Sequence, residues 1–215
     1  GYILMKDIKK KFDQCLEVSR ENKKYLNLSI KRSQGKLPDM EVAKAFSKLL
    51  RKDIKNSIKL LDVGCLSGHF LHTFRKKNNK NFFYQGLDPF NIHIDAAKKI
   101  WKKDKNANFK LGWAQKIPFS RKEFDILICS NVLTHIPNIL HPIKEFIRVT
   151  SNKIIIRTPV HNKSYRIQMV LNNKWWKYTN VKPKDEFDKN GNPRSFEYYD
   201  VHSKDYLESV IKRFS

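Results

Sequence analysis

The stretch KLLDVGCLSGHF, residues 59–70, decides the fold of this chain. Its first half reads as an apolar strand that ends near an acidic residue, Asp62, and its second half reads as a glycine turn that leads into a helix over residues 67–77. Gly64 permits a sharp turn of the backbone, and Gly68 leaves room where a ligand must approach. The first amides of the helix are expected to point outward without partners. The pattern predicts a site for a nucleotide-like ligand.

A second strand that ends in an acidic residue follows one helix later, over residues 81–88. In nucleotide-binding βαβ units, an acid at the position of Asp88 accepts hydrogen bonds from the two ribose hydroxyls, and the alternative is that it caps the following helix. The later elements alternate, with helices expected over 91–103 and 139–149 and strands over 108–113, 124–130 and 153–157. This order predicts an α/β fold.

Three segments taken together resemble the class I S-adenosylmethionine-dependent methyltransferases, in particular the broad group of small-molecule enzymes. They are LLDVGCLSGHF (60–70), GLDPF (86–90) and AQKIPFSRKEFDILICSNVLTHI (114–136). The resemblance covers residues 58–158 and implies a Rossmann-like, doubly wound, mostly parallel sheet, with S-adenosylmethionine as the cofactor. Relatives add two strands after the last helix, and we expect either that this chain is a fragment or that those strands are lost. The sheet should therefore have about five parallel strands.

The resemblance also implies roles for residues at the strand ends. Asp62 would lie near the methionine amino group and Asp88 would bind the ribose. The other implied cofactor contacts are Gly64, Cys65, Leu66, Ser67 and Gly68 in the turn, Pro89 and Phe90 beside the adenosine, Trp113, Ala114 and Gln115 at the adenine edge, and Ser130 and Asn131 facing the methyl group. Two residues depart from the family pattern. Leu66 stands where relatives have a glycine, and Trp113 stands where they have an acid and either stacks on adenine or fills the core.

Methyl transfer requires alignment of donor and acceptor, and removal of a proton from an acceptor that carries one. His135 is the candidate general base, because an imidazole accepts a proton near neutral pH; the alternative is that it holds its loop. Five side chains are expected either to line the acceptor pocket or to form a hydrophobic seam: His161, Tyr165, Trp175, Tyr198 and Tyr199. The sequence shows no metal-ligand cluster, so metal-independent transfer is expected. The predicted acceptor is an oxygen or nitrogen of a sugar, a nucleotide sugar or another small metabolite.

The chain divides into three parts of one expected domain. Residues 1–55 form a helical preface, residues 56–158 the cofactor-binding core, and residues 159–215 a cap insertion with the last helix. In the cap, strands at 175–178 and 195–199 are expected to pair as a β-hairpin across a glycine- and asparagine-containing turn. The last helix is expected from Ser203, which is a good capping residue, to Arg213.

Composition limits the function without naming it. Of the 215 residues 40% are hydrophobic, and the longest apolar runs are too short to span a membrane. Cys15, Cys65 and Cys129 are odd in number and widely spaced, which suits reduced thiols in the cytoplasm. The sequence leaves the oligomeric state open.

The formal charge of +23 favours anionic partners, and most of the 44 basic residues are lysines spread along the whole chain. Phosphate readers more often cluster arginine, so a solvated basic surface is the preferred interpretation. Two alternatives to the small-molecule enzyme follow. One is an RNA methyltransferase, motivated by the charge, and the other is a degenerate cofactor-binding module without catalysis, motivated by Leu66 and Trp113.

Overall fold

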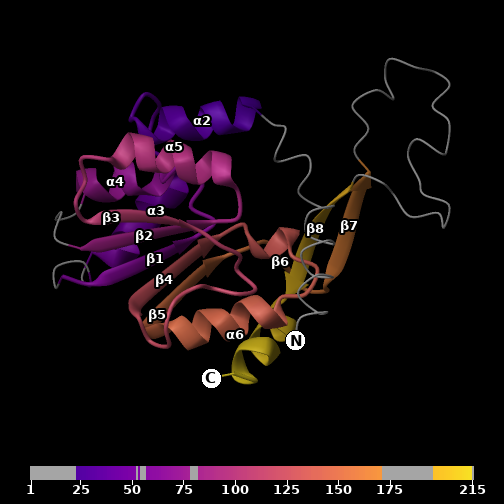
Figure 1. The fold of residues 1–215 in the computed structure, drawn as a ribbon. Helices are drawn as coiled ribbons and strands as arrows, with labels where there is room; N and C mark the ends of the chain where they lie inside the picture. The colour runs from indigo at the N-terminus through magenta and orange to yellow at the C-terminus, as the bar shows by residue number, and fades with distance from the viewer. Residues whose placement is uncertain (1–22, 52, 54–56, 78–81, 171–195, 215) are drawn as a thin grey trace, which may run out of the picture.

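A computed structural model describes residues 23–51, 53, 57–77, 82–170 and 196–214 (Figure 1). A five-stranded sheet runs through its centre in the order β3-β2-β1-β4-β5, and all four strand pairs are parallel, as the sequence predicted. The strands of this sheet are β1 (Lys59–Val63), β2 (Phe83–Asp88), β3 (Ala107–Leu111), β4 (Phe124–Ser130) and β5 (Thr150–Arg157).

Helices cover both faces of this sheet, as a doubly wound fold requires (Figure 1). They are α2 (Lys23–Ser33), α3 (Glu41–Leu50), α4 (His69–Lys77), α5 (Asn91–Trp101) and α6 (Leu140–Val149). The first four lie on one face, with α2 outermost over α4 and α5, and α6 lies on the other.

The period of two along each strand divides the core between the two faces. Leu60 of β1 and Ile126 of β4 pack with the face that α3, α4 and α5 cover. Their chain neighbours Leu61 and Leu127 pack with the α6 face. Because both faces are buried, β1 and β4 read as continuous apolar runs rather than as alternating patterns. This is why the sequence revealed these two strands most clearly.

A second, smaller sheet lies at one end of the molecule, in the order β6-β8-β7. Its strands are β6 (Val160–His161), β7 (Tyr165–Val170) and β8 (Phe196–Ser203), and β7 pairs antiparallel with β8. The sequence predicted β8 but not β7 as its neighbour. The predicted partner strand, 175–178, lies outside the described residues.

Most element boundaries differ from the predictions by one or two residues, but β5 begins three residues earlier than predicted, at Thr150, and β8 continues four residues further, to Ser203. The helix after the turn begins at His69 rather than at residue 67, and β3 ends at Leu111. Helix α8 (Lys204–Lys212) begins as predicted, because the Ser203 hydroxyl accepts a hydrogen bond from the Tyr206 amide at 3.2 Å. Within the described residues, no helix has the length and apolar character needed to cross a lipid bilayer.

Candidate functional site

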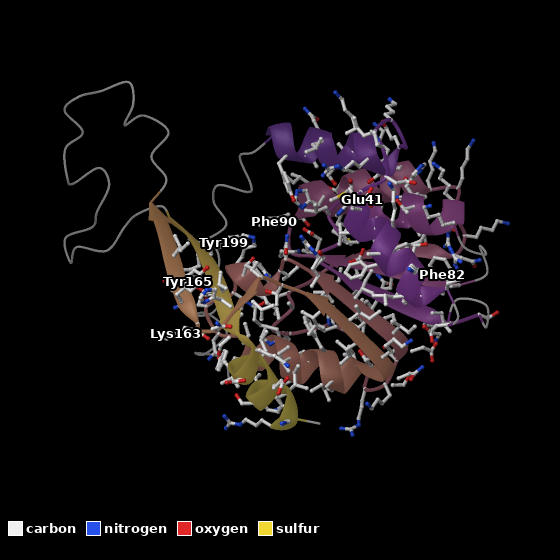
Figure 2. The ribbon with its side chains drawn as sticks, turned by 180° about the vertical axis from the view of Figure 1, so that it is seen from behind. Glu41, Phe82, Phe90, Lys163, Tyr165 and Tyr199 are labelled. Atoms are coloured by element: carbon white, nitrogen blue, oxygen red, sulfur yellow. The ribbon has the colours of Figure 1, made fainter. Side chains whose placement is uncertain are left out.

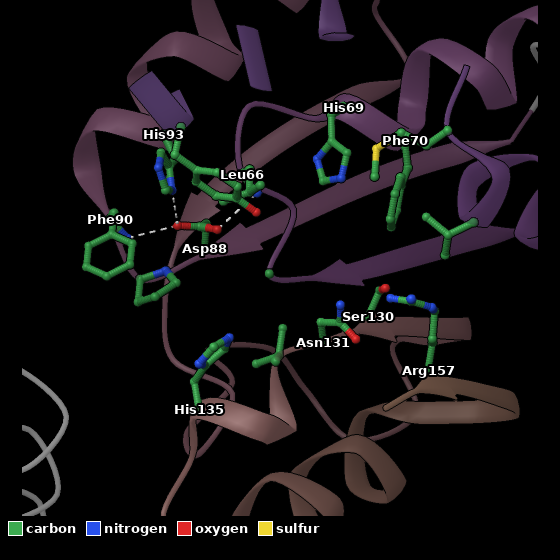
Figure 3. Close-up of a pocket in the computed structure, with 16 residues that line it drawn as sticks. Leu66, His69, Phe70, Asp88, Phe90, His93, Ser130, Asn131, His135 and Arg157 are labelled. Carbon is green, nitrogen blue, oxygen red and sulfur yellow. Dashed lines mark hydrogen bonds and ion pairs between the residues drawn. The ribbon is translucent and has the colours of Figure 1, made fainter. Parts of the chain in front are cut away.

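A cavity of about 260 Å³ lies at the carboxyl ends of β1, β2 and β4 (Figure 3). Strand β1 has β2 on one side and β4 on the other, so the order of the sheet reverses here. Ligands of open α/β sheets bind at such a reversal. Eight of the residues predicted from the sequence line this cavity: Gly64, Leu66, Asp88, Pro89, Phe90, Ser130, Asn131 and His135.

Asp88 is the acidic residue at the edge of this cavity, and its side chain is 2% exposed. One carboxylate oxygen accepts hydrogen bonds from the Phe90 amide at 3.1 Å and from Nδ1 of His93 at 3.0 Å. The other accepts from the Leu66 amide at 2.9 Å. Phe90 is the N-cap residue of α5, so Asp88 does not itself cap that helix. A carboxylate offers about four acceptor sites, so these three donors leave room for a ligand hydroxyl.

The turn between β1 and α4 has an unusual backbone. Gly64 and Gly68 have φ angles of 80° and 77°, and Leu66 between them has a φ of 51°. A leucine in this left-handed region is strained, by roughly 1–2 kcal/mol. The family glycine that Leu66 replaces would relieve that strain. The Leu66 side chain also lines the cavity.

The turn amides are not free for a ligand, contrary to the sequence expectation. Gly64 and Cys65 both donate to the Leu87 carbonyl, at 2.8 and 3.1 Å, and Leu66 donates to Asp88. The Ser67 amide donates to the Ser29 hydroxyl at 3.3 Å, and the Gly68 amide donates to the Cys65 carbonyl at 2.9 Å. The expectation counted only bonds within the helix, and it missed the partners on β2, on α2 and, for Gly68, in the turn itself.

Ser67 holds the preface helix α2 against this turn. Its hydroxyl lies 2.6 Å from that of Ser29 and 2.8 Å from that of Ser33, and both partners belong to α2. The Ser33 hydroxyl also donates to the Ser67 carbonyl at 3.0 Å. The cluster is buried, and α2 thereby brings Tyr25 to the cavity wall. Ser67 therefore acts on the cavity through α2 rather than by lining it.

Cys65 and Gly68 also lie outside the lining. The Cys65 side chain is fully buried, and burial raises the pKa of its thiol well above its usual value. This keeps the thiol protonated, so Cys65 is not suited to act as a nucleophile. Gly68 lies against the rings of Trp101 and Phe109, where a β-carbon would have no space.

Asp62 is buried beneath the turn and does not line the cavity. Its carboxylate accepts a hydrogen bond of 2.5 Å from the Tyr84 hydroxyl. Burial, together with the nearby charge of Asp88, raises the pKa of Asp62 to about 7, although the Tyr84 bond opposes the shift. The role expected for Asp62 near the methionine amino group, directly or through water, stays a prediction.

The raised pKa of Asp62 predicts a pH-dependent stability. Between about pH 4 and pH 7 the folded protein holds a proton on Asp62 that the unfolded chain has released, so the free energy of unfolding falls as pH rises. Asp62→Asn removes this loss, which amounts to at most about 4 kcal/mol above pH 7. Urea denaturation at pH 5 and pH 8 measures the slope, which should be flatter in the variant. Equal slopes for the two proteins would contradict this prediction, and Asp95→Asn, on the exposed side of α5, serves as the control.

His135 lies in the short 3-10 helix η2 (Leu133–His135), on the opposite side of the cavity from the turn (Figure 3). Its Nδ1 lies 3.1 Å from the Tyr198 carbonyl oxygen. A carbonyl only accepts, so Nδ1 carries the proton and Nε2 holds the lone pair of the neutral ring. The two roles predicted for His135 are therefore compatible: one nitrogen holds the loop to β8, and the other has the chemistry of a base.

The remaining predicted residues do not line this cavity. Trp113 packs with the core on the α6 side, which favours the core-filling alternative, and Ala114 is buried in the same core. Gln115 follows in a turn that Trp113 and Lys116 close as an isolated bridge. Strand β3 ends at Leu111, level with Asp88 of β2, and the turn that follows packs into the core of the α6 face instead of onto the cavity.

The predicted acceptor residues lie on the smaller sheet. Tyr165 and Tyr199 are on β7 and β8 (Figure 2), and both are partly exposed. His161 pairs with the Tyr165 ring at 5.8 Å, and Tyr198 lies beneath the Arg166 guanidinium. The ring of Tyr199 lies 6.3 Å from that of His135, which links this sheet to the cavity edge. Trp175 lies outside the described residues.

Sequence reasoning missed seven residues that line the cavity: Tyr25, Met40, Val42, His69, Phe70, His93 and Arg157. Nδ1 of His69 donates to the Cys65 carbonyl at 3.3 Å, and burial lowers the pKa of His69 to about 4, so its ring is neutral near pH 7. His93 follows Asp88 by five residues, at the start of α5, and this spacing was the available signal. Within the described residues, no group of three or more metal-ligating side chains is gathered.

Comparison with known proteins gives a consistent picture. A family model described as a methyltransferase domain matches residues 54–200. The chain is 34% identical over 89 residues to the tRNA U34 carboxymethyltransferase of Nautilia profundicola, across 40% of this chain and 28% of that protein. It is 30% identical over 112 residues to an uncharacterized methyltransferase of Schizosaccharomyces pombe, across 48% of this chain and 40% of the relative.

The chain therefore matches less than half of the length of each of these two relatives. A solved structure of an S-adenosylmethionine-dependent methyltransferase from Mesorhizobium loti superposes with a TM-score of 0.54. The superposition covers 80% of this chain and 79% of that one, at 9% sequence identity. At this identity the likeness extends to the fold.

Proposed function

The chain belongs to the methyltransferase domain family, whose model spans residues 54–200, and from this membership we propose that it transfers a methyl group from S-adenosylmethionine to a small molecule. The acceptor atom in this proposal is an oxygen or nitrogen of a sugar, a nucleotide sugar or another metabolite. A cytoplasmic location belongs to the same proposal, supported by the two buried free thiols, Cys65 and Cys129.

The observation that carries the proposal is the position of Asp88 on the cavity. Three donors from the turn, the loop and α5 fix its carboxylate at the tip of β2, where a remaining acceptor site suits a ribose hydroxyl. Phe90 and Pro89 supply an apolar wall beside it, and Met40 and Val42 supply another. The donor set and the walls fit an adenosine.

When bound, S-adenosylmethionine supplies an electrophilic methyl group on a sulfonium. The protein aligns the acceptor with that methyl group and takes a proton from an acceptor that carries one. Ser130 and Asn131 form the cavity edge at the end of β4, and His135 lies across from the turn. With Nδ1 donating to the Tyr198 carbonyl, Nε2 of His135 is the nitrogen that would take the proton of an acceptor that carries one.

Calorimetry with S-adenosylmethionine and S-adenosylhomocysteine tests the proposal directly. We expect both to bind, and NAD⁺ to give no heat under the same conditions. No binding of either methionine compound at millimolar concentration would remove the enzyme hypothesis. Binding without turnover on any acceptor would favour the alternative of a non-catalytic module.

RNA is the second candidate acceptor, favoured by the charge of +23 and by the similarity to a tRNA-modifying enzyme. Binding of an RNA acceptor would weaken steeply with salt, because contacts with phosphates release counterions. A titration of total tRNA at two salt concentrations separates the candidates. Measurable tRNA affinity at moderate salt that falls steeply as the salt concentration rises favours RNA as the acceptor. No measurable tRNA affinity at moderate salt favours a small molecule.

Leu66→Gly should tighten cofactor binding, by about threefold to tenfold, while leaving the fold intact. The substitution removes a side chain from the cavity wall and relieves the left-handed strain at φ 51°. Calorimetric titration with S-adenosylhomocysteine gives the comparison. Leu66→Ala is the matched control, because it removes most of the side chain but keeps the strain. Weaker binding by the glycine variant would show that the leucine side chain contributes contact rather than obstruction.

A further inference from the structure

Arg157 ends β5 and lines the cavity on the far side from Asp88 (Figure 3). Its carbonyl accepts a hydrogen bond from the Asn131 amide at 2.8 Å, which anchors its backbone beside the end of β4. Arg157 is exposed, so its guanidinium is accessible to a ligand. Across the described part of the chain, no acidic side chain forms an ion pair with it.

The two acids at the ends of β1 and β2 have hydrogen-bond partners other than Arg157. Asp62 is buried and bonded to Tyr84, and Asp88 accepts three hydrogen bonds at the tip of β2. Strands β2 and β5 are three strand spacings apart in the sheet, which is about 14 Å. The cavity thus has a carboxylate at one end and an unneutralised guanidinium at the other. Only an extended ligand, or two ligands side by side, would contact both.

We propose that Arg157 is an anion-binding residue of this cavity that pairs with a carboxylate or phosphate group of the bound ligand. A guanidinium presents its donors in a planar fork that matches either anion with two parallel hydrogen bonds. The proposal rests on the proposed function for the identity of the cavity as the reaction site. The anion has two sources, the amino-acid carboxylate of S-adenosylmethionine or an anionic group on the acceptor.

The first arm of the test compares two cofactor fragments. S-adenosylhomocysteine carries the amino-acid carboxylate, and 5′-methylthioadenosine lacks the whole amino-acid end. If the anion belongs to the cofactor, Arg157→Ala weakens S-adenosylhomocysteine binding by about tenfold to a hundredfold and leaves methylthioadenosine binding unchanged. Arg157→Lys should recover part of the loss, because it keeps the charge but not the fork.

The second arm tests the acceptor as the source. Inorganic phosphate is titrated into the protein saturated with S-adenosylhomocysteine, and the side-chain Nε–H signal of Arg157 is followed by NMR. If the anion belongs to the acceptor, this signal shifts saturably in the wild-type protein, and S-adenosylhomocysteine binds the Arg157→Ala variant normally.

Arg121→Ala is the matched control for both arms. Arg121 is also an exposed arginine, and it precedes β4 at the amino-terminal end of that strand, whereas the cavity lies at the carboxyl ends. Its loss therefore changes the net charge but not the cavity. The proposal is overturned if Arg157→Ala behaves like Arg121→Ala with both fragments and the Arg157 signal ignores phosphate. Failure of the wild-type protein to bind either fragment would instead contradict the proposed function, and the phosphate arm, run on the protein alone, still decides the role of Arg157.

Discussion

Asp88→Ala is expected to bind S-adenosylhomocysteine at least about a hundredfold more weakly than the wild-type protein. The substitution removes the acceptor proposed for the ribose hydroxyls. It also leaves the Leu66 amide, the Phe90 amide and the His93 ring without their shared partner. Hydrogen bonds to a charged group contribute about 1.5–3 kcal/mol each, so the substitution disturbs the shape of the cavity edge as well as removing the ribose contact.

Two further variants separate these effects. Asp88→Asn keeps one acceptor oxygen and replaces the other with an NH2 group, which only donates. It should therefore retain more of the fold than of the cofactor affinity. Asp95→Ala removes an exposed acid from α5 and should bind normally. Calorimetry gives the affinities and circular dichroism the fold. A folded Asp88→Ala variant with wild-type affinity would show that the ribose lies elsewhere.

Gly68→Ala is expected to lower the free energy of unfolding by about 2–5 kcal/mol, a large share of the total for a domain of this size. Two costs add. Its φ of 77° is strained for any residue with a β-carbon, and that carbon would lie 2.7 Å from Nε1 of Trp101 and 2.9 Å from Cε1 of Phe109. Phe109 belongs to β3 and is buried in the core, and Trp101 ends α5 with its Nε1 donating to the Ser67 carbonyl at 3.2 Å, so a shift of either ring costs packing or this hydrogen bond.

Urea denaturation followed by tryptophan fluorescence measures this loss. Leu66→Gly, two residues earlier in the same turn, should move stability in the opposite direction or leave it unchanged, because it relieves a positive φ instead of creating a strained one. An unchanged midpoint for Gly68→Ala would mean that the turn adopts a different backbone from the one described.

The parts of the fold that the sequence predicted correctly are those controlled by local pattern. Buried parallel strands carry continuous apolar residues, so β1 and β4 were recognisable from Leu60–Val63 and Ile126–Cys129 alone. The Ser203 cap was recognisable for the same reason, since a capping serine acts on the next three residues. Strand β7 was missed because its partner β8 lies some thirty residues further along the chain, and pairing at that distance leaves no local mark.

The site shows the same division. Asp88 and His135 end or follow strands that converge on one edge, so their approach to one cavity follows from topology. The hydrogen bond between Asp62 and the Tyr84 hydroxyl joins two strands, and Trp113 packs against core residues far from it in the sequence. Arg157 was overlooked because an arginine at the end of a strand looks like any solvated charge until its neighbours are known. These contacts join residues that are far apart in the sequence, so the spacing of residues along the chain does not reveal them.

The serine cluster that joins α2 to the turn has a consequence for how this basic protein responds to its medium. Ser29, Ser33 and Ser67 meet through uncharged hydroxyls in a buried place. Hydroxyls do not titrate in the physiological range, and mobile ions do not screen them. Salt and acid, which weaken attractions among the many lysines and the few acids, leave this junction untouched. The helix that carries Tyr25 to the cavity wall is thus held by a contact that does not respond to conditions that rearrange the charged surface around it.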